Sequence, residues 1–253
     1  MLDPTRRFSD RVEYYVRFRP GYPPALLHCL QQHSGLDRST TVADLGAGTG
    51  IFTAILLPLA GRVHAVEPNA AMRAAAEQAL GAQTNFVSHA GTAEATTLPS
   101  ASVDLITVAQ AFHWFDHPVC RREFARILKP GGQVALIWNE RLSNTTPFLR
   151  AYEDLLRTCT ADYDEVNHVQ FDDAAIGAFF APAGFGKHTF PNAQSFDLAG
   201  LTGRALSSSY VPNVGQPGHA AFLAGLQAIF RRHADAGCVA FHYRTVLFLG
   251  RLP

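Results

Sequence analysis

Short apolar runs alternate with amphipathic stretches along the first half of the chain. The runs that predict strands are TVADL (41–45), RVHAVE (62–67), TNFVSH (84–89), VDLITVA (103–109) and QVALIWN (133–139). Between the second and third runs, Met72, Ala76 and Leu80 share one face at helical spacing, and Asn69 is placed to cap that helix. Strands that alternate with helices are typical of βαβ units, which build a parallel sheet with helices on both faces.

The pattern changes after residue 142. Two late strands are expected at GKHTFPNAQSF (186–196) and VAFHYRTVLFLG (239–250), with helices near 198–207 and 217–234 between them. Helices are also expected within PFLRAYEDLLRTC and DDAAIGAFFAPAGF. Together with the five earlier strands, this pattern predicts the α/β class and a doubly wound, seven-stranded, mostly parallel sheet.

No stretch is rich enough in Gly, Ser or Pro to separate two domains. We therefore expect a single domain over residues 1–253. Within it, residues 1–35 would form an N-terminal lid and a first helix, and residues 36–142 the ligand-binding core. Residues 143–253 would complete the sheet and form a helical cap over the substrate.

Composition narrows the classes of partner. The chain has 253 residues, of which 47% are hydrophobic, and its 21 Lys+Arg balance its 21 Asp+Glu. A neutral chain lacks the basic face that nucleic-acid binders use. No apolar run is long enough to cross a bilayer, MLDPTRRFSD lacks the apolar centre of a secretory signal, and the four cysteines form no CxxC pair. We expect a cytoplasmic protein with neither a membrane nor a nucleic-acid partner; the oligomeric state stays open.

A glycine-rich turn, DLGAGTG, follows the first expected strand. Glycines at positions 46, 48 and 50 permit a sharp turn and the close approach of a ligand, although such turns also occur without one. The dinucleotide pattern GxGxxG would need a glycine where Ile51 stands. Glu67 ends the second strand about 20 residues later, where a carboxylate can accept the hydroxyls of a ribose. This position serves NAD and S-adenosylmethionine equally.

Several motifs taken together resemble those of the class I S-adenosylmethionine-dependent methyltransferases. The matching pieces are VADLGAGTG (42–50), HAVEPNAAM (64–72), GTAEATTLPSASVDLITVAQAFHWFD (91–116) and ILKPGG (127–132). FHWFD and YYVRFRPGYP (14–23) resemble the small-molecule, trans-aconitate methyltransferase-like branch. The resemblance implies a Rossmann-like fold, S-adenosyl-L-methionine as cofactor, and in-line methyl transfer to a small carboxylate, hydroxyl or amine. The GxGxG spacing and LKPGG disfavour the alternative of an NAD-linked oxidoreductase; a non-catalytic S-adenosylmethionine-binding module stays open.

The resemblance also implies roles for individual residues. Asp44 and the glycine turn would line the methionine and ribose, Glu67 would hold the ribose diol, and Gln110 would face the methyl group. The other implied cofactor contacts are Gly46, Ala47, Gly48, Gly50, Pro68 or Asn69, Thr92, Ala93 and Glu94. Many relatives have aspartate where this chain has Thr92, which can accept a hydrogen bond but carries no charge.

The N-terminal segment YYVRFRPGYP is both aromatic and basic. Tyr14, Tyr15, Arg19 and Tyr22 are candidates for a lid over the cofactor. An arginine can bind the methionine carboxylate as a fork, and an aromatic face attracts a sulfonium cation. The alternative is that these aromatic side chains pack the N-terminal arm onto the helices.

The stretch AQAFHWFDHP contains His113, for which we consider three roles. A metal site shared with His117 is disfavoured, because Asp116 suits a helix cap and Pro118 a first turn, which places His113 before the helix. His113 can act as a base if the acceptor is a hydroxyl or an amine. The third role is structural: the side chain can form a wall of the cleft or a packed corner of the core. No metal is expected.

The acceptor would lie beside the ends of the fourth and fifth strands. Trp114, Trp138 and Asn139 are expected to shape this cleft, and Arg141 and Tyr210 to cap it. Arg141 and Arg204 are candidates for binding an acidic substrate. The simpler expectation is that both arginines are solvated.

Overall fold

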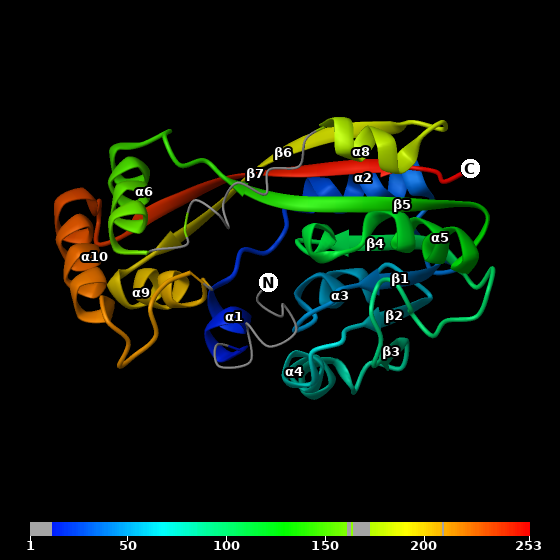
Figure 1. The fold of residues 1–253 in the computed structure, drawn as a ribbon, viewed down its shortest axis with the longest axis horizontal. Coiled ribbons are helices and arrows are strands. Elements are labelled where there is room, and N and C mark those ends of the chain that lie inside the picture. Colours follow the sequence, from blue (N-terminus) through cyan, green and yellow to red (C-terminus); the bar gives the residue numbers. More distant parts are fainter. Residues whose placement is uncertain (1–11, 161–162, 164–172, 209) are drawn as a thin grey trace.

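The computed structural model describes residues 12–160, 163, 173–208 and 210–253. A seven-stranded sheet has the order β3-β2-β1-β4-β5-β7-β6 (Figure 1). Its strands are β1 (Thr41–Leu45), β2 (Arg62–Val66), β3 (Phe86–His89), β4 (Val103–Ala109), β5 (Leu128–Arg141), β6 (Phe185–Phe196) and β7 (Val239–Gly250). The helices are α1 (Val12–Phe18), α2 (Pro24–Ser34), α3 (Ile51–Leu56), α4 (Ala70–Leu80), α5 (His117–Ile127), α6 (Pro147–Cys159), α8 (Asp173–Phe180), α9 (Leu198–Leu206) and α10 (His219–His233), with a short 3-10 turn η2 (Phe112–Trp114).

The sheet is doubly wound and mostly parallel, as predicted. Strands β1 to β5 pair in parallel, and β7 runs antiparallel to both β5 and β6. The chain winds outward from β1 to β2 and β3, then returns to place β4 on the other side of β1. β5 is longer than the predicted 133–139, because Leu128 pairs with Val103 and Arg141 pairs with Tyr243.

Local signals in the sequence fix the helix starts as predicted. The Asn69 side chain accepts hydrogen bonds from the backbone N–H groups of Ala71 and Met72, both at 3.0 Å, and so caps α4. Asp116 caps α5 by accepting from the Val119 N–H at 3.1 Å, with Pro118 in the first turn. The η2 turn, which contains His113, therefore lies just before a helix rather than within one.

Alternate residues of the central strands enter different cores. Val42 and Leu105 pack with α2 and α3 on one face, whereas Ala43 and Ile106 pack with α5 and α8 on the other. A third core joins α6, α9 and α10 to the first part of β7. Figure 1 shows these three helices gathered beyond the far end of the long strands β6 and β7. These helices come from the C-terminal part of the sequence, where helices are expected, and we call them the helical cap.

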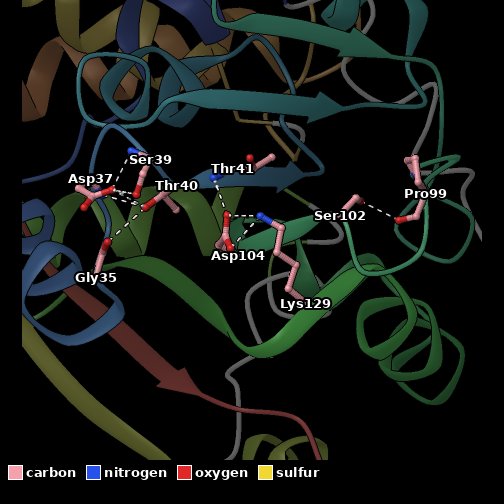
Figure 2. A network of polar contacts seen from close by, with 9 residues as sticks. All are labelled: Gly35, Asp37, Ser39, Thr40, Thr41, Pro99, Ser102, Asp104 and Lys129. Carbon is pink, nitrogen blue, oxygen red and sulfur yellow. Dashed lines mark hydrogen bonds and ion pairs between the residues drawn. The ribbon is translucent and has the colours of Figure 1, made fainter.

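The amino ends of three strands are joined by a polar network (Figure 2). The Asp104 carboxylate on β4 accepts from the Thr41 N–H on β1 at 2.9 Å and from the Lys129 ammonium on β5 at 2.8 Å. In the loop before β1, Asp37 accepts from both the N–H and the hydroxyl of Ser39. The Asp104 contacts hold β1, β4 and β5 together at their amino ends, opposite to the carboxyl ends of these strands.

No helix in the described part of the chain is both long and apolar enough to cross a membrane.

Candidate functional site

A cavity of about 560 Å³ lies at the carboxyl ends of β1, β4 and β5. β1 and β4 are neighbours at the point where the winding of the sheet reverses, which is where open α/β sheets bind their ligands. The predicted site residues that line this cavity are Arg19, Asp44, Gly46, Ala47, Gly48, Gln110, His113, Trp138, Asn139, Arg141 and Tyr210. The fold therefore brings together residues from both halves of the chain.

The glycine turn exposes its backbone to this cavity. Gly46 adopts a φ of +67°, and a Cβ atom there would lie 2.6 Å from the Ala111 Cβ, so only glycine fits. Gly48 also has a positive φ, and the nearest atom to a Cβ built there is the Met72 sulfur at 3.9 Å. The Thr49 hydroxyl is buried in the same turn and has no hydrogen-bond partner among the described residues. Thr49 lines the cavity, and sequence reasoning did not single it out.

The carboxylate of Asp44 is buried at the end of β1. It accepts hydrogen bonds from the Thr53 hydroxyl at 2.6 Å and from the Thr107 hydroxyl at 2.8 Å. Burial is the main reason why the pKa of Asp44 rises to about 6, and the nearby charge of Glu67 adds to it, against the lowering effect of the two hydroxyls. No cation of the described residues pairs with this carboxylate.

Glu67 binds the glycine turn to the start of the next loop. Its carboxylate accepts from the Gly48 N–H and from the Asn69 N–H, each at 2.8 Å. Burial raises the pKa of Glu67, while these two N–H groups and the charge of Arg73 act in the opposite direction. Glu67 is only 8% exposed and does not line the cavity itself.

Gln110 follows β4 in a conformation that is rare for a residue with a side chain. Its φ is +61°, and its N–H donates to the Ile137 carbonyl of β5 at 2.9 Å. Strained backbone of this kind gathers at ligand sites, where the surrounding structure holds it in place. Gln110 lines the cavity, next to the η2 turn.

His113 and His117 have different surroundings, as expected from the helix start between them. His113 lines the cavity with its ring centroid 4.6 Å from that of Trp114. His117 stacks on Phe112 at 4.1 Å, and its Nε2 lies 3.1 Å from the Phe112 carbonyl oxygen. Burial, together with the charge of Arg19, lowers the pKa of His113 to about 4. The imidazole is therefore neutral at physiological pH.

Part of the N-terminal segment borders the cavity. Arg19, Pro20 and Tyr22 line it, and an Arg19 N–H donates to the Ser207 carbonyl of the helical cap at 2.9 Å. The amide of Asn139, at the end of β5, donates to the Gly21 carbonyl at 3.0 Å and so holds this segment against the sheet. Residues 1–11 of the expected lid, and the Tyr15 side chain, lie outside the described part of the chain.

Arg141 is not solvated, contrary to the simpler expectation. Its side chain is 13% exposed and forms an ion pair with Glu153 at 2.6 Å, while the Tyr163 hydroxyl contacts both partners. The guanidinium also lies 5.0 Å from the centre of the Tyr152 ring. The charge of Arg141 is thus already balanced within the protein.

Arg204 is also buried, and here too the expectation of a solvated arginine is wrong. The residue is 6% exposed because α9 presses it against β7. Its guanidinium donates to the Tyr243 hydroxyl at 3.2 Å and to the Ser208 hydroxyl at 3.1 Å, and it lies over the Phe241 ring. Among the described residues it has neutral partners but no carboxylate, although it lines the cavity. A buried cation of this kind is costly unless an anion joins it.

The positive charges of Arg141 and Arg204 both act on the hydroxyl of Tyr210. Burial acts to raise the pKa of its hydroxyl, but the charges of Arg141 and Arg204 outweigh burial, and the pKa is lowered. Tyr243 supplies a second phenol to the same end of the cavity. Sequence reasoning missed Tyr243; the alternation of β7, which turns Phe241, Tyr243 and Thr245 to one side, was the available signal.

Eight predicted site residues do not line the cavity. These are Tyr14, Gly50, Glu67, Pro68, Thr92, Ala93, Glu94 and Trp114. Trp114 is 36% exposed, and Tyr14 is exposed and stacks on Phe18. Glu94 accepts from the Asp116 N–H at 3.0 Å, which connects the loop after β3 to the start of α5.

Comparison with known proteins gives consistent matches. Residues 43–136 match a family described as "Methyltransferase domain". An uncharacterized methyltransferase of Mycobacterium bovis is 41% identical over 139 residues, covering 55% of this chain and 54% of that protein. An uncharacterized methyltransferase of Schizosaccharomyces pombe is 33% identical over 155 residues, covering 61% and 60%. The chain thus spans between half and two thirds of the length of these curated relatives.

A solved structure shares the fold across nearly the whole chain. It is a protein from Anaeromyxobacter dehalogenans provisionally described as a type II methyltransferase, with a TM-score of 0.66 and 25% identity. The match covers 93% of this chain and 99% of that one.

The raised pKa of Asp44 predicts how stability depends on pH. In the unfolded chain this carboxyl ionises near its ordinary pKa of 3.8, but in the folded protein near 6. Between these values the folded state holds a proton that the unfolded state releases, so Asp44 reduces stability as pH rises through this window. The free energy of unfolding of Asp44→Asn minus that of wild type should therefore increase by about 2–3 kcal/mol as the pH rises from 4 to 7. Urea denaturation at several pH values measures this difference, and identical pH dependence of the two proteins would contradict it.

Proposed function

Because this chain belongs to the class I S-adenosylmethionine-dependent methyltransferase superfamily, we propose that it transfers a methyl group from S-adenosylmethionine to a small anionic acceptor. The acceptor would lie between the carboxyl ends of β4 and β5 and the helical cap. The observation that carries the choice of acceptor is the buried Arg204, which lines the cavity without a carboxylate partner among the described residues.

The residues around the glycine turn fit the cofactor. Asp44 offers a buried carboxylate to a cationic ammonium group, which would stabilise its charged form. The backbone at Gly48 is open to a close neighbour, and the buried Thr49 hydroxyl lacks a partner that a bound polar group can supply. Arg19 lines the same cavity and can hold a carboxylate group in a fork.

The adenosine part of the cofactor would lie toward Glu67. Its two carboxylate oxygens hold the N–H groups of Gly48 and Asn69, and each oxygen retains a further lone pair for a ribose hydroxyl. Thr92, Ala93 and Glu94 follow β3 on this side, where we assign them to the adenine. The Thr92–Ala95 bridge gives this loop a defined shape, so backbone groups there can replace the aspartate of many relatives.

When bound, S-adenosylmethionine supplies a methyl group on a positively charged sulfonium sulfur. The sulfur leaves as part of a neutral thioether when a nucleophile takes the methyl group. The protein's task is then to align the acceptor oxygen and to exclude water. Gln110, His113, Trp138 and Arg204 all line the cavity. We assign Gln110 to the methyl group, and Trp138 and Arg204 to the acceptor. Arg204 would hold the acceptor through one oxygen or one carboxylate group while another faces the methyl.

A carboxylate is the acceptor class that best matches these groups. It is already ionised at neutral pH and becomes a neutral ester when it gains a methyl group, so no proton has to be removed. A hydroxyl or amine would benefit from a base near neutral pH, but the pKa of His113 is lowered to about 4. We therefore assign His113 to the wall of the cleft, where its neutral ring orients the acceptor.

Glu67 provides the test of cofactor binding. Wild type should bind S-adenosylmethionine with a micromolar Kd in isothermal titration calorimetry, and Glu67→Ala should weaken binding by tenfold or more. Glu67→Gln, which retains one acceptor oxygen for the turn, should fall between them. Glu77→Ala, an exposed carboxylate on α4, is the matched control and should bind as wild type does. Equal affinity in Glu67→Ala and wild type would rule out the ribose assignment.

Arg204 provides the test of the acceptor class. Arg204→Met removes a buried charge but preserves much of the side-chain volume, so its melting temperature should equal or exceed that of wild type. Its kcat/KM for a carboxylate acceptor should fall at least a hundredfold, while its Kd for S-adenosylmethionine stays within twofold. Arg204→Lys should recover part of the activity because it retains the charge.

The control for this pair is Arg231→Ala, an exposed arginine on α10, which should keep full activity. Strong destabilisation of Arg204→Met with unchanged kcat/KM would show that Arg204 serves the fold and would overturn the acceptor assignment.

A further inference from the structure

Three side chains with metal-binding atoms meet on the α2 side of the sheet. They are Cys29 and His33 of α2 and His188 of the edge strand β6. One ligand atom from each residue lies within 4.8 Å of the other two, and the two imidazole centroids are 5.0 Å apart. None of the three lines the cavity at the strand ends. The proposed methyl transfer leaves this cluster unexplained.

The helix presents its two ligands on its inward face. Leu26, Cys29 and Leu30 form the buried stripe of α2, and His33 continues it one turn further along. Cys29 and His33 are four residues apart, which is the spacing that sets two side chains side by side on a helix. Cys29 is 7% exposed, whereas His33 lies at the exposed end of the stripe.

The strand presents the third ligand by alternation. His188 and Phe190 point to the same side of β6, and Phe190 packs into the core formed by α2 and α3. Lys187 points to the opposite side, where its ammonium lies 5.2 Å from the centre of the Phe248 ring. Gly186 leaves room for the imidazole, because a Cβ atom there would lie 3.2 Å from the His188 Nε2.

We propose that Cys29, His33 and His188 form a zinc site that fastens α2 to the edge strand β6. One thiolate and two imidazoles are ligands that Zn²⁺ binds in tetrahedral geometry, and solvent would take the fourth position beside the exposed His33. Rotation of the exposed His33 side chain can bring the ligand atoms from their present spacing to the shorter one of a zinc site. The site lies in the last turns of α2, where the negative end of the helix dipole favours a cation.

Binding of the metal has a defined proton balance. A thiol has an ordinary pKa of about 8.5, so Cys29 carries its proton at neutral pH when no metal is bound. The zinc ion forms a bond to sulfur as the S–H proton passes to the buffer, and each imidazole binds through a lone pair without losing a proton. One proton is therefore released for each zinc ion bound.

Cobalt(II) is the probe for this site, because it occupies zinc sites and reports its ligands by absorption. The full chain, free of any affinity tag and kept reduced with a phosphine, is titrated with Co²⁺ and then with Zn²⁺. Wild type should bind one equivalent of Co²⁺, with a thiolate-to-metal charge-transfer band and the strong visible bands of four-coordinate cobalt. Zn²⁺ should displace it completely, and calorimetry in buffers of different ionisation enthalpy should report one proton released.

Variants assign the ligands. Cys29→Ser should lose the charge-transfer band, and His33→Gln and His188→Gln should each weaken binding of Zn²⁺ at least tenfold. The matched controls are His28→Gln, an exposed histidine on α2, and Cys159→Ser, and both should bind as wild type does. His188→Gln decides the question if Cys29→Ser fails to fold. Absence of the charge-transfer band in wild type, or Zn²⁺ binding that is equal in wild type and His188→Gln, would overturn the proposal.

Discussion

The buried carboxylate of Asp44 is the constraint on which the pocket depends. The residue is the last but one of β1, and its oxygens accept from Thr53 on α3 and from Thr107 on β4. One side chain thus fixes the strand before the glycine turn, the helix after it, and the neighbouring strand across the winding reversal. Burial raises the pKa of Asp44, and the hydrogen bonds from the two hydroxyls offset only part of this rise. The pocket therefore contains a negative charge that a cationic ligand would stabilise.

At the opposite end of the pocket the buried charges are positive instead of negative. Arg141 and Arg204 are both buried, but only Arg141 has a carboxylate partner, Glu153, among the described residues. An unpaired buried charge lowers stability, and such a cost is tolerated where function requires it. The two ends together favour a ligand pair with a cationic group at the glycine turn and an anionic group under the helical cap. A pocket that only packs apolar side chains would not need buried charges of opposite sign at its two ends.

Much of the fold could be predicted from the sequence because its signals are local. Strand alternation, the Asn69 and Asp116 caps and Pro118 each depend on neighbours within a few residues, and the structure confirms them. The surroundings of single side chains could not be predicted in this way. Both arginines are expected in solvent from the sequence, because no local signal shows that Arg141 packs against Glu153 and Tyr152 of α6 or that Arg204 packs against β7. His113 could be placed before a helix, but its lowered pKa depends on burial and on Arg19, which lies far away in the sequence. His33 and His188 likewise meet only because α2 packs against the edge of the sheet.

The central claim is that the pocket joins an S-adenosylmethionine methyl group to a carboxylate held by Arg204. Its most direct test is incubation of the protein with S-adenosylmethionine that carries a trideuterated methyl group and a panel of small carboxylates, each paired with its neutral amide. Mass spectrometry then identifies the labelled products. The account predicts a labelled, base-labile methyl ester from at least one carboxylate and no label on its amide. Label on hydroxyl or amine acceptors alone, or equal label on a carboxylate and its amide, would contradict it.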